Sequence, residues 1–284
     1  MNLRAYAKLN IGLRILGKRS DGYHDIETIF HQIDLCDELS FEPAKTVRLT
    51  TSSSGIPPDS TNLCVRAAQM FREHTGHTEG IEIRLIKRIP VGAGLGGGSS
   101  DAATVLVALN KIWKTGMVLR ELELLASQLG SDVPFFIQGG TAAGTSRGEV
   151  LDHFDLNIPY WILTVTPPIH ISTEWAYSHV QLEAISNAKP LRTLVEALMA
   201  SPDDIHTHIR NDFEGLVFQK YPEIRRLKEK LDLTGAIFVQ LSGSGSSIFC
   251  FYRHETAART AMAELASTCA TSLTRPDFKP KQIS

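Results

Sequence analysis

The sequence predicts an α+β fold in two halves, an N-terminal half built on a mixed β-sheet and a C-terminal half with a ferredoxin-like order. From about residue 160 onward, the pattern of apolar and polar residues runs strand, helices, strand, strand, helix, strand, which is the order of a split βαβ unit. A composition shift at residues 139–144 (Gly-Gly-Thr-Ala-Ala-Gly) separates this pattern from the strands that open the chain. We therefore expect an N-terminal domain over residues 1–155 and a C-terminal domain over residues 156–284.

In the first half, apolar runs predict strands over 3–16, 26–42 and 46–51, and an alternating segment predicts a half-exposed strand over 81–86. Helical spacing and capping residues predict three helices. The first spans about 61–74 with Ser60 or Thr61 as its cap, the second starts at Ser99, and the third spans about 119–129 and stops at Gly130.

In the second half, an apolar strand over 160–165 ends at Pro167-Pro168. Helical stretches follow near 174–183, 190–199 and 211–231. Residues 236–241 and 248–252 read as a hairpin around the glycine and serine residues at 242–246, and a helix over 255–268 and a strand near 270–275 close the chain.

Composition excludes several classes of function. The chain has 284 residues, 43% of them hydrophobic, which suffices for a buried core. Its net charge of −2 does not favour electrostatic binding to nucleic acid. It has no apolar run of membrane-spanning length and no signal-peptide core at its start, so we expect a cytoplasmic protein with no membrane partner. The cysteines are scattered without C-x-x-C spacing, which predicts buried free thiols, and the pairs His74/His77 and His206/His208 lack the partners of a metal site.

The most informative segment is residues 90–103, Pro-Val-Gly-Ala-Gly-Leu-Gly-Gly-Gly-Ser-Ser-Asp-Ala-Ala. Glycines at this density let successive backbone N–H groups form a concave nest for an anion. A helix follows, with Ala102, Leu106, Leu109 and Trp113 on one face, and its N-terminus adds further donors. We interpret the segment as a phosphate-binding loop, and the competing interpretation is a glycine-rich surface turn.

Better-known phosphate loops fit this segment poorly. A P-loop requires Gly-Lys-Ser/Thr, and here Gly98 is followed by two serines. Gly92, Gly94 and Gly97 match G-x-G-x-x-G, but the preceding strand alternates and no acidic residue ends a second strand about twenty residues later. The H-R-D and D-F-G signatures of protein kinases are absent from the sequence.

Three other segments carry polar residues of interest. Lys8 and Asn10 lie in the first strand, on the face opposite Ala7 and Leu9, where a lysine is ordinarily solvent-facing. Asp132 opens an apolar turn at 129–136 and could simply cap it. Tyr23 and His24 follow a flexible glycine in what could be an ordinary turn.

Together these segments resemble the GHMP kinases, through Ala7-Lys8-Leu9-Asn10, residues 90–103 and Leu241-Ser242-Gly243-Ser244-Gly245. The stretch 16–24, the triple glycine before Ser99-Ser100 and the stretch 129–134 narrow the resemblance to members that act on a cytidine-diphosphate-linked methylerythritol. Those members belong to the methylerythritol phosphate route to isoprenoids. Two positions depart from the family pattern. Asp101 stands where asparagine is frequent, and Ser146-Arg147-Gly148-Glu149 replaces a Gly-x-Gly-Glu turn.

The resemblance implies the GHMP kinase fold, with an N-terminal half like domain 2 of ribosomal protein S5, and phosphoryl transfer from ATP with Mg²⁺ to the tertiary 2-hydroxyl of the substrate. Lys8 and Asp132 would be the catalytic pair, with Lys8 near the transferring group and Asp132 accepting or orienting the hydroxyl proton. Such transfers depend on positioning and charge neutralisation. The resemblance assigns the ATP phosphates to one continuous segment: Pro90, Val91, Gly92, Ala93, Gly94, Leu95, Gly96, Gly97, Gly98, Ser99 and Ser100.

The resemblance also implies a cytosine site. Tyr23 and an aromatic residue of the segment 173–177 would sandwich the base, with Tyr177 matching better than Trp175, and His24 would read its hydrogen-bonding edge. The implied substrate-binding residues are Asn10, Tyr23, His24, Thr173, Tyr177, Ser242 and Gly243.

Two other functions compete with this interpretation. A homoserine- or mevalonate-type kinase would share the motifs, but would have no use for a base-reading loop at 21–24. A catalytically silent nucleotide sensor would have had no need to keep both Lys8 and Asp132. We expect a monomer or a weak homodimer.

Overall fold

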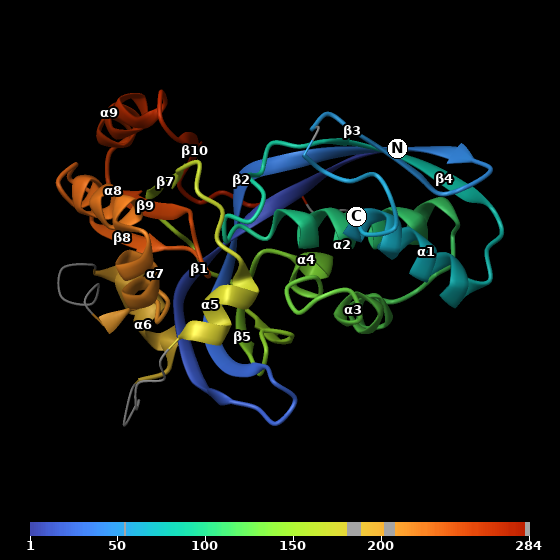
Figure 1. Ribbon diagram of the computed structural model, residues 1–284, viewed down its shortest axis with the longest axis horizontal. Helices are drawn as coiled ribbons and strands as arrows, with labels where there is room; N and C mark the ends of the chain where they lie inside the picture. Colours follow the sequence, from blue (N-terminus) through green and yellow to red (C-terminus); the bar gives the residue numbers. More distant parts are fainter. Residues whose placement is uncertain (54, 181–188, 202–207, 282–284) are drawn as a thin grey trace.

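The computed structural model describes residues 1–53, 55–180, 189–201 and 208–281. The chain forms two β-sheets, one in each half, with helices packed on them (Figure 1). This is the α+β architecture that the sequence predicts.

The N-terminal sheet has six strands. They are β1 (Asn2–Lys18), β2 (His24–Ala44), β3 (Arg48–Thr51), β4 (Gly80–Ile86), β5 (Thr141–Thr145) and β6 (Val150–His153). The order is β3-β4-β2-β5-β6, β1 pairs with β2, and only β3 and β4 run parallel, so the sheet is mixed. Its helices are α1 (Leu63–Thr75), α2 (Gly97–Ile112), α3 (Leu119–Ser127) and the single turn α4 (Phe135–Gln138).

The C-terminal sheet contains β7 (Trp161–Thr166), β8 (Phe238–Leu241), β9 (Ile248–Tyr252) and β10 (Ala270–Thr274). Its order is β10-β7-β9-β8, with every described pair antiparallel, which is the ferredoxin-like arrangement. The helices are α5 (Thr173–His179), α6 (Leu191–Ala200), α7 (Glu214–Lys220), α8 (Pro222–Asp232) and α9 (Glu255–Leu265).

Several predicted boundaries were wrong. The helix predicted over 211–231 is two helices, because Pro222 has no N–H to continue α7 and instead begins α8. The first helix starts at Leu63 with Asn62 as its cap, and the second at Gly97 rather than Ser99. Helix α5 stops at His179, and part of the predicted stretch 174–183 lies outside the described residues.

The first strand differs most from the prediction. The alternating pattern placed Lys8 and Asn10 on the face opposite Ala7 and Leu9, where a lysine is ordinarily solvent-facing, but every residue from Ala5 to Ile15 is buried. The reason is visible in Figure 1, where β1 and β2 run between the helices of the N-terminal half and the C-terminal sheet. A strand covered on both faces buries its polar residues together with its apolar ones.

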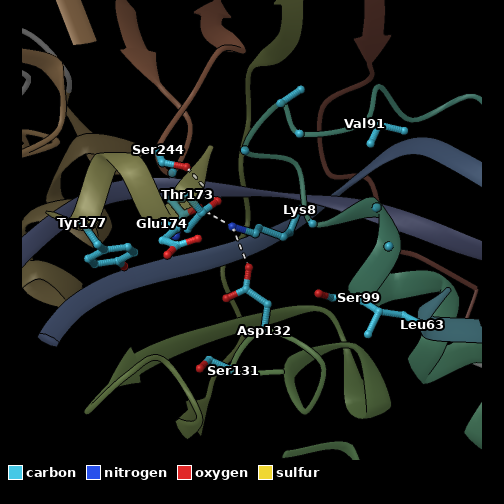
Figure 2. Close-up of a pocket in the computed structure, with 18 of the residues that line it drawn as sticks. Lys8, Leu63, Val91, Ser99, Ser131, Asp132, Thr173, Glu174, Tyr177 and Ser244 are labelled. Carbon is cyan, nitrogen blue, oxygen red and sulfur yellow. Dashed lines mark hydrogen bonds and ion pairs between the residues drawn. The ribbon is translucent and has the colours of Figure 1, made fainter. Parts of the chain in front are cut away.

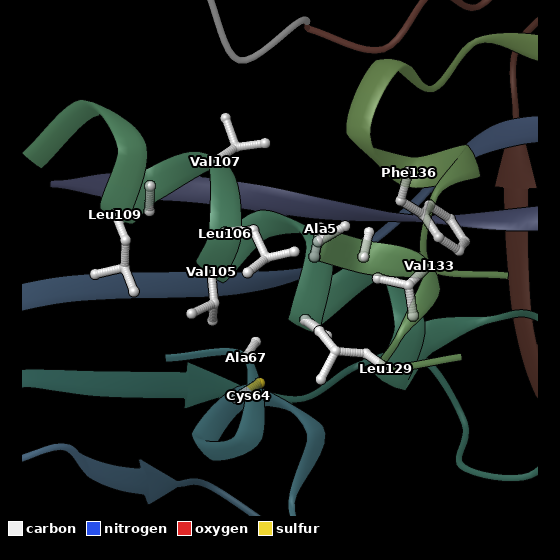
Figure 3. Close-up of a cluster of buried hydrophobic side chains, with 14 of the residues drawn as sticks. Ala5, Cys64, Ala67, Val105, Leu106, Val107, Leu109, Leu129, Val133 and Phe136 are labelled. Atoms are coloured by element: carbon white, nitrogen blue, oxygen red, sulfur yellow. The ribbon is translucent and has the colours of Figure 1, made fainter. Parts of the chain in front are cut away.

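Three hydrophobic clusters hold the fold together. One lies under α1 and α2 in the N-terminal half and includes Cys64, Leu106 and Val133 (Figure 3). The second fills the C-terminal half. The third joins side chains of β1 and β2 to side chains of β7, β9 and α6, so the two halves share a core. Cys36, Cys64 and Cys250 are buried free thiols, as predicted, whereas Cys269 is only half-buried.

Candidate active site

A cavity of about 970 Å³ lies between the glycine loop, the β1–β2 hairpin and helix α5. Its wall also includes the turn before α4 and the β8–β9 turn, so both halves of the chain contribute to it. Segments far apart in the sequence therefore meet at one site (Figure 2).

Lys8 and Asp132 face each other across the middle of this cavity. Lys8 Nζ lies 3.3 Å from Asp132 Oδ2 and also donates to Asn10 Oδ1 (Figure 2). The lysine side chain is 5% exposed and the carboxylate 35% exposed, so the cation is held in place while the carboxylate faces the open space. Asn10 is fixed in turn by donating from Nδ2 to Thr28 Oγ1 at 3.0 Å.

The glycine loop wraps closely over this pair. Gly92, Gly94 and Gly96 have φ values of 63°, 76° and 68°, in the left-handed region that side chains disfavour. A Cβ on Gly94 would collide with the carbonyl oxygen of Ser242, and one on Gly96 would lie 2.8 Å from the Phe136 ring. Gly96 is also the N-cap of the sixteen-residue helix α2, whose first N–H groups are positioned for an anion in the cavity.

Most of the predicted phosphate-loop residues line the cavity: Pro90, Val91, Gly92, Ala93, Gly94, Gly96, Gly97, Gly98 and Ser99. Leu95 and Ser100 do not. Leu95 is buried in the shared core, its carbonyl accepting from the N–H of Lys8, and Ser100 Oγ donates to the carbonyl of Tyr6 at 2.7 Å. Both residues therefore tie the loop to β1.

Ser242, for which a contact with substrate is predicted, does not line the cavity itself. Its side chain donates to the carbonyl of Gly94 at 3.0 Å and accepts from the N–H of Asn10 at 3.3 Å. Ser242 thus links the three motifs that suggested the family. Its neighbour Gly243 lines the cavity with a φ of 56°.

An aromatic group closes one end of the cavity. The rings of His24 and Tyr177 stack at 5.3 Å with an interplanar angle of 29°, and Tyr23, 54% exposed, lies under the guanidinium of Arg147 at 4.8 Å. Burial, aided by the charge of Lys18, lowers the pKa of His24, so its ring is neutral at pH 7. Burial raises the pKa of Tyr177, which stays a hydrogen-bonding phenol.

Tyr177 rather than Trp175 reaches the cavity. Trp175 packs instead on His179 and, edge to face, on Tyr221. Thr173, on the same helix, lines the cavity and shares a hydrogen bond of 3.2 Å with Ser244 Oγ (Figure 2). Sequence reasoning left the two aromatic residues open, because helix α5 is too short for a periodic pattern to orient it.

The sequence reasoning missed several residues of the site. Asn211 donates from Nδ2 to the carbonyls of Leu241 and Gly243, both at 2.8 Å, and so holds the β8–β9 turn. No motif marks Asn211, and the same is true of Lys87. Asp101 and Arg147 lie at the two positions where the sequence departs from the family pattern. Those departures could have marked both residues as candidates for the site. The cavity is further lined by Lys18, Leu63, Lys87, Asp101, Arg147 and Glu174.

Within the described ranges, no group of three or more histidine, cysteine, aspartate or glutamate side chains could hold a metal ion. No helix in the described part of the chain is long and apolar enough to span a membrane.

Comparison with known proteins gives consistent results. Residues 62–140 match the family model of the GHMP kinases N-terminal domain, and residues 182–271 match the GHMP kinases C-terminal model. The chain is 43% identical over 281 residues to the 4-diphosphocytidyl-2-C-methyl-D-erythritol kinase of Chlorobium limicola, and 41% identical over 280 residues to that of Prosthecochloris aestuarii. Each alignment covers 98% of both proteins.

Solved structures show the same relationship. A crystal structure of a 4-(cytidine 5'-diphospho)-2C-methyl-D-erythritol kinase superposes with a TM-score of 0.83 and 33% identity, covering 98% of this chain and 100% of that one. A homoserine kinase from Cytophaga hutchinsonii superposes with a TM-score of 0.68 at 21% identity, covering 97% of this chain and 96% of that one. At that identity, the second superposition shows the fold alone.

Proposed function

This chain belongs to the GHMP kinase family, and we propose that it transfers the γ-phosphoryl group of ATP to the 2-hydroxyl of 4-diphosphocytidyl-2-C-methyl-D-erythritol. The products are the 2-phosphate and ADP. The reaction is a step of the methylerythritol phosphate pathway of isoprenoid biosynthesis.

The observation that carries the proposal is the meeting of three features in one cavity. The Lys8–Asp132 pair lies beside a nest of backbone N–H groups, and an aromatic group with a neutral imidazole closes the same space. A nest of backbone N–H groups by itself could bind any phosphate group, and an aromatic group by itself could stack on any planar ring. The combination fits a phosphoryl donor at one end and a substrate that carries a nucleobase at the other.

In the proposed mechanism, catalysis rests on positioning and charge neutralisation. Asp132 orients the 2-hydroxyl and receives its proton, and Lys8 neutralises charge that develops on the transferring group. A tertiary alcohol is hindered and has a high pKa, so we infer that its proton leaves late, as the new P–O bond forms. Lys8 is suited to this role because its buried ammonium is held by both Asn10 and Asp132.

The glycine loop would hold ATP as its magnesium complex, in which the ion would supply further charge neutralisation. The N–H groups of Gly94 to Ser99 and the N-terminus of α2 would receive its phosphates. A loop whose glycines have no room for a Cβ brings its backbone close to the anion.

The other end of the cavity would hold cytosine. Tyr23 and Tyr177 offer stacking faces, and the neutral ring and backbone of His24 offer a donor and an acceptor to the edge of the base. Arg147 and Lys18, which also line the cavity, supply positive charge toward the diphosphate of the substrate. Thr173 and Gly243 complete the wall.

The remaining expectations are also part of the proposal. We propose that residues 1–155 and 156–284 are the two domains, and that the protein acts in the cytoplasm as a monomer or weak homodimer without a nucleic-acid partner.

ADP release by the purified protein tests the function. Magnesium ATP is supplied with 4-diphosphocytidyl-2-C-methyl-D-erythritol, and parallel reactions contain mevalonate, homoserine or the uridine analogue. We expect ADP release with the cytidylyl substrate alone, because uracil presents an acceptor where cytosine presents its amino donor. Equal release with mevalonate or homoserine would contradict the proposal.

A further inference from the structure

Three ionisable side chains, outside the chemistry described so far, lie buried beside the glycine loop. They are Asp37 of β2, Lys87 just after β4, and Asp101 near the N-terminus of α2, with side-chain exposures of 0%, 7% and 3%. Lys87 Nζ pairs with Asp37 Oδ2 and lies 2.8 Å from Asp101 Oδ2. With all three ionised, this cluster carries one net negative charge.

The two carboxyl groups differ in how well they are satisfied. Asp37 Oδ1 accepts hydrogen bonds from the N–H groups of Arg88 and Ile89, at 2.5 and 2.8 Å. Asp101 Oδ1 is buried and has no hydrogen-bond partner. Asp101 and Lys87 line the cavity, whereas Asp37 does not. Asp101 Oδ1 is therefore the oxygen of this cluster on which a proton could reside.

The cluster lies directly behind the predicted phosphate-binding backbone. A Cβ built on Gly97, the first residue of α2, would lie 2.8 Å from Lys87 Nζ. The phosphates of a nucleotide on this loop would thus lie near two carboxyl groups and one ammonium. Like charges disfavour each other's ionised forms, so nucleotide binding favours protonation of the unsatisfied carboxylate.

In the described part of the chain, the charged groups that act on the Asp101 carboxyl are Lys87 and Asp37. Helix α1 contributes Cys64, whose pKa is raised by its complete burial, so the thiol is neutral. Lys8 of β1 is paired with Asp132, and α4 has no titratable side chain.

Helix α3 carries Arg120, Glu121 and Glu123. The first two are exposed and the third is half-buried. The local balance near Asp101 is therefore set by Asp37 and Lys87.

We propose that Asp101 is the proton-accepting residue of the nucleotide site, which takes up one proton from solvent on Oδ1 when the phosphates of ATP bind the glycine loop. The proton cancels the net negative charge of the cluster while Lys87 stays bound between its two partners. Asp101 is thus a positioning residue that acts on the nucleotide through the charge behind the loop. This inference rests on the proposed function only in assuming that the loop binds a nucleotide.

The ionisation of the free protein agrees with this role. Burial, opposed by Lys87 and reinforced by Asp37, raises the pKa of Asp101 to about 7. Burial disfavours the ammonium of Lys87, but Asp101 and Asp37 outweigh it and raise the pKa of that lysine. A nucleotide that raises this pKa further makes the protein take up a proton wherever the free carboxyl group is ionised, so affinity falls as the pH rises. One linked proton limits the fall to about tenfold per pH unit.

Calorimetry of magnesium ADP binding tests the proposal. Titrations at pH 8 in Hepes and in Tris, whose ionisation enthalpies differ, give the number of protons taken up, and a series from pH 6 to 9 gives the slope of affinity. For the wild-type protein we expect proton uptake at pH 8 and a declining affinity above pH 7. For Asp101→Asn we expect binding without that uptake and with a flatter slope.

The matched control is Asp232→Asn. Asp232 is also a carboxyl group whose pKa is raised by burial, but it lies at the end of α8, outside the cavity. We expect this variant to keep the proton uptake of the wild type.

Two outcomes would overturn the inference: no proton uptake by the wild-type protein at pH 8, or equal uptake by wild type and Asp101→Asn. The first needs no variant and so stands even if the substitution impairs folding. Absence of any ADP binding would instead contradict the proposed function, so the two failures can be told apart.

The pH dependence of folding stability tests the raised pKa of Asp101 independently of nucleotide binding. A carboxyl group with a raised pKa in the folded state binds more protons there than in the unfolded chain, so stability falls as the pH rises from about 4 to 7. Asp101→Asn removes this loss. We expect its melting temperature to exceed that of the wild type by more at pH 8 than at pH 5.

Discussion

At the scale of single residues, Asp132 carries the central prediction. Asp132→Asn keeps the shape of the side chain but removes its charge and its ability to accept the proton. Turnover should fall by about 10²–10⁴-fold, the usual contribution of a general base, while ATP affinity changes little. Steady-state kinetics together with nucleotide binding measures both. Asp152→Asn, which alters an exposed carboxylate in a surface ion pair, is the control. An Asp132→Asn enzyme with nearly normal turnover would contradict the assigned role.

Tyr23 tests the recognition of the base. Tyr23→Ala removes a stacking face worth about 1–3 kcal/mol, which corresponds to a KM for the cytidylyl substrate raised about 5- to 150-fold. The effect should be on KM rather than kcat, because contacts remote from the reacting atoms are equal in ground and transition states. Tyr23→Phe keeps the stacking face and should behave as wild type. A Tyr23→Ala enzyme with an unchanged KM would show that this ring does not contact the base.

Single residues also show why sequence reasoning is incomplete. Lys8 looks like a solvent-facing strand lysine until its motif is recognised, because nothing local shows that β1 is covered on both faces. Ser242 and Ser100 sit in recognisable motifs, yet their side chains hold the backbone together and do not line the cavity. A motif locates a segment, and only the fold decides which of its side chains face the ligand.

At the scale of elements, the glycine loop is the part most open to test. A Cβ on Gly96 would contact the Phe136 ring at 2.8 Å and the Lys8 side chain at 3.1 Å, in a left-handed backbone conformation. Gly96→Ala should therefore displace both the loop and the catalytic lysine. We expect much weaker ATP binding and lower turnover, measured by calorimetry and by ADP release.

Gly116→Ala separates two causes of weaker binding, namely disturbance of the site by the new side chain and the backbone strain that a side chain causes at positive φ. Gly116 has a φ of 72°, close to that of Gly96, but nothing lies within 4 Å of its Cβ position. This control introduces backbone strain without disturbing the site. If both variants lost nucleotide affinity equally, global strain rather than the loop would explain the result.

Elements with a periodic or alternating pattern were predictable, and two strands without one were not. The helices α2 and α9 and the hairpin of β8 and β9 appear in the sequence as periodic or alternating runs. Strands β5 and β6 were missed because neither has a clear run of alternating or β-branched apolar residues, and β5 is rich in alanine and glycine. The pairing of β5 with β2 is a long-range contact that no local pattern encodes, and β6 pairs in turn with β5.

At the scale of the whole molecule, the cavity depends on how the two halves are joined. Gln240 of β8 accepts from the N–H of Gly12 at 2.6 Å, and Asp212 accepts from the N–H of Ile15 at 2.8 Å. These bonds fix the β1–β2 hairpin against the C-terminal half. Because the hairpin carries Lys8 and the C-terminal half carries Tyr177, the same contacts set the position of Tyr177 relative to Lys8 in the cavity.

The shared core predicts that neither half is stable alone. Leu9, Ile11, Ile29 and Ile33 are all 0% exposed in the intact chain, in a cluster completed by β7, β9 and α6. A fragment of residues 1–155 would expose these side chains to water, at a cost of about 1.5–3 kcal/mol for each fully buried aliphatic group. That sum rivals the whole stability of an ordinary domain, about 5–15 kcal/mol.

We therefore expect the intact chain to unfold in one transition, and the fragment 1–155 to show no cooperative melt in calorimetry or circular dichroism. Ile11→Ala, which opens a cavity in the shared core, should lower the single melting temperature of the intact chain without splitting the transition, since it weakens both halves together. Two resolved transitions, or a fragment that melts cooperatively near the temperature of the intact protein, would contradict this. The halves would then be independent domains, and the cavity between them would be free to open and close.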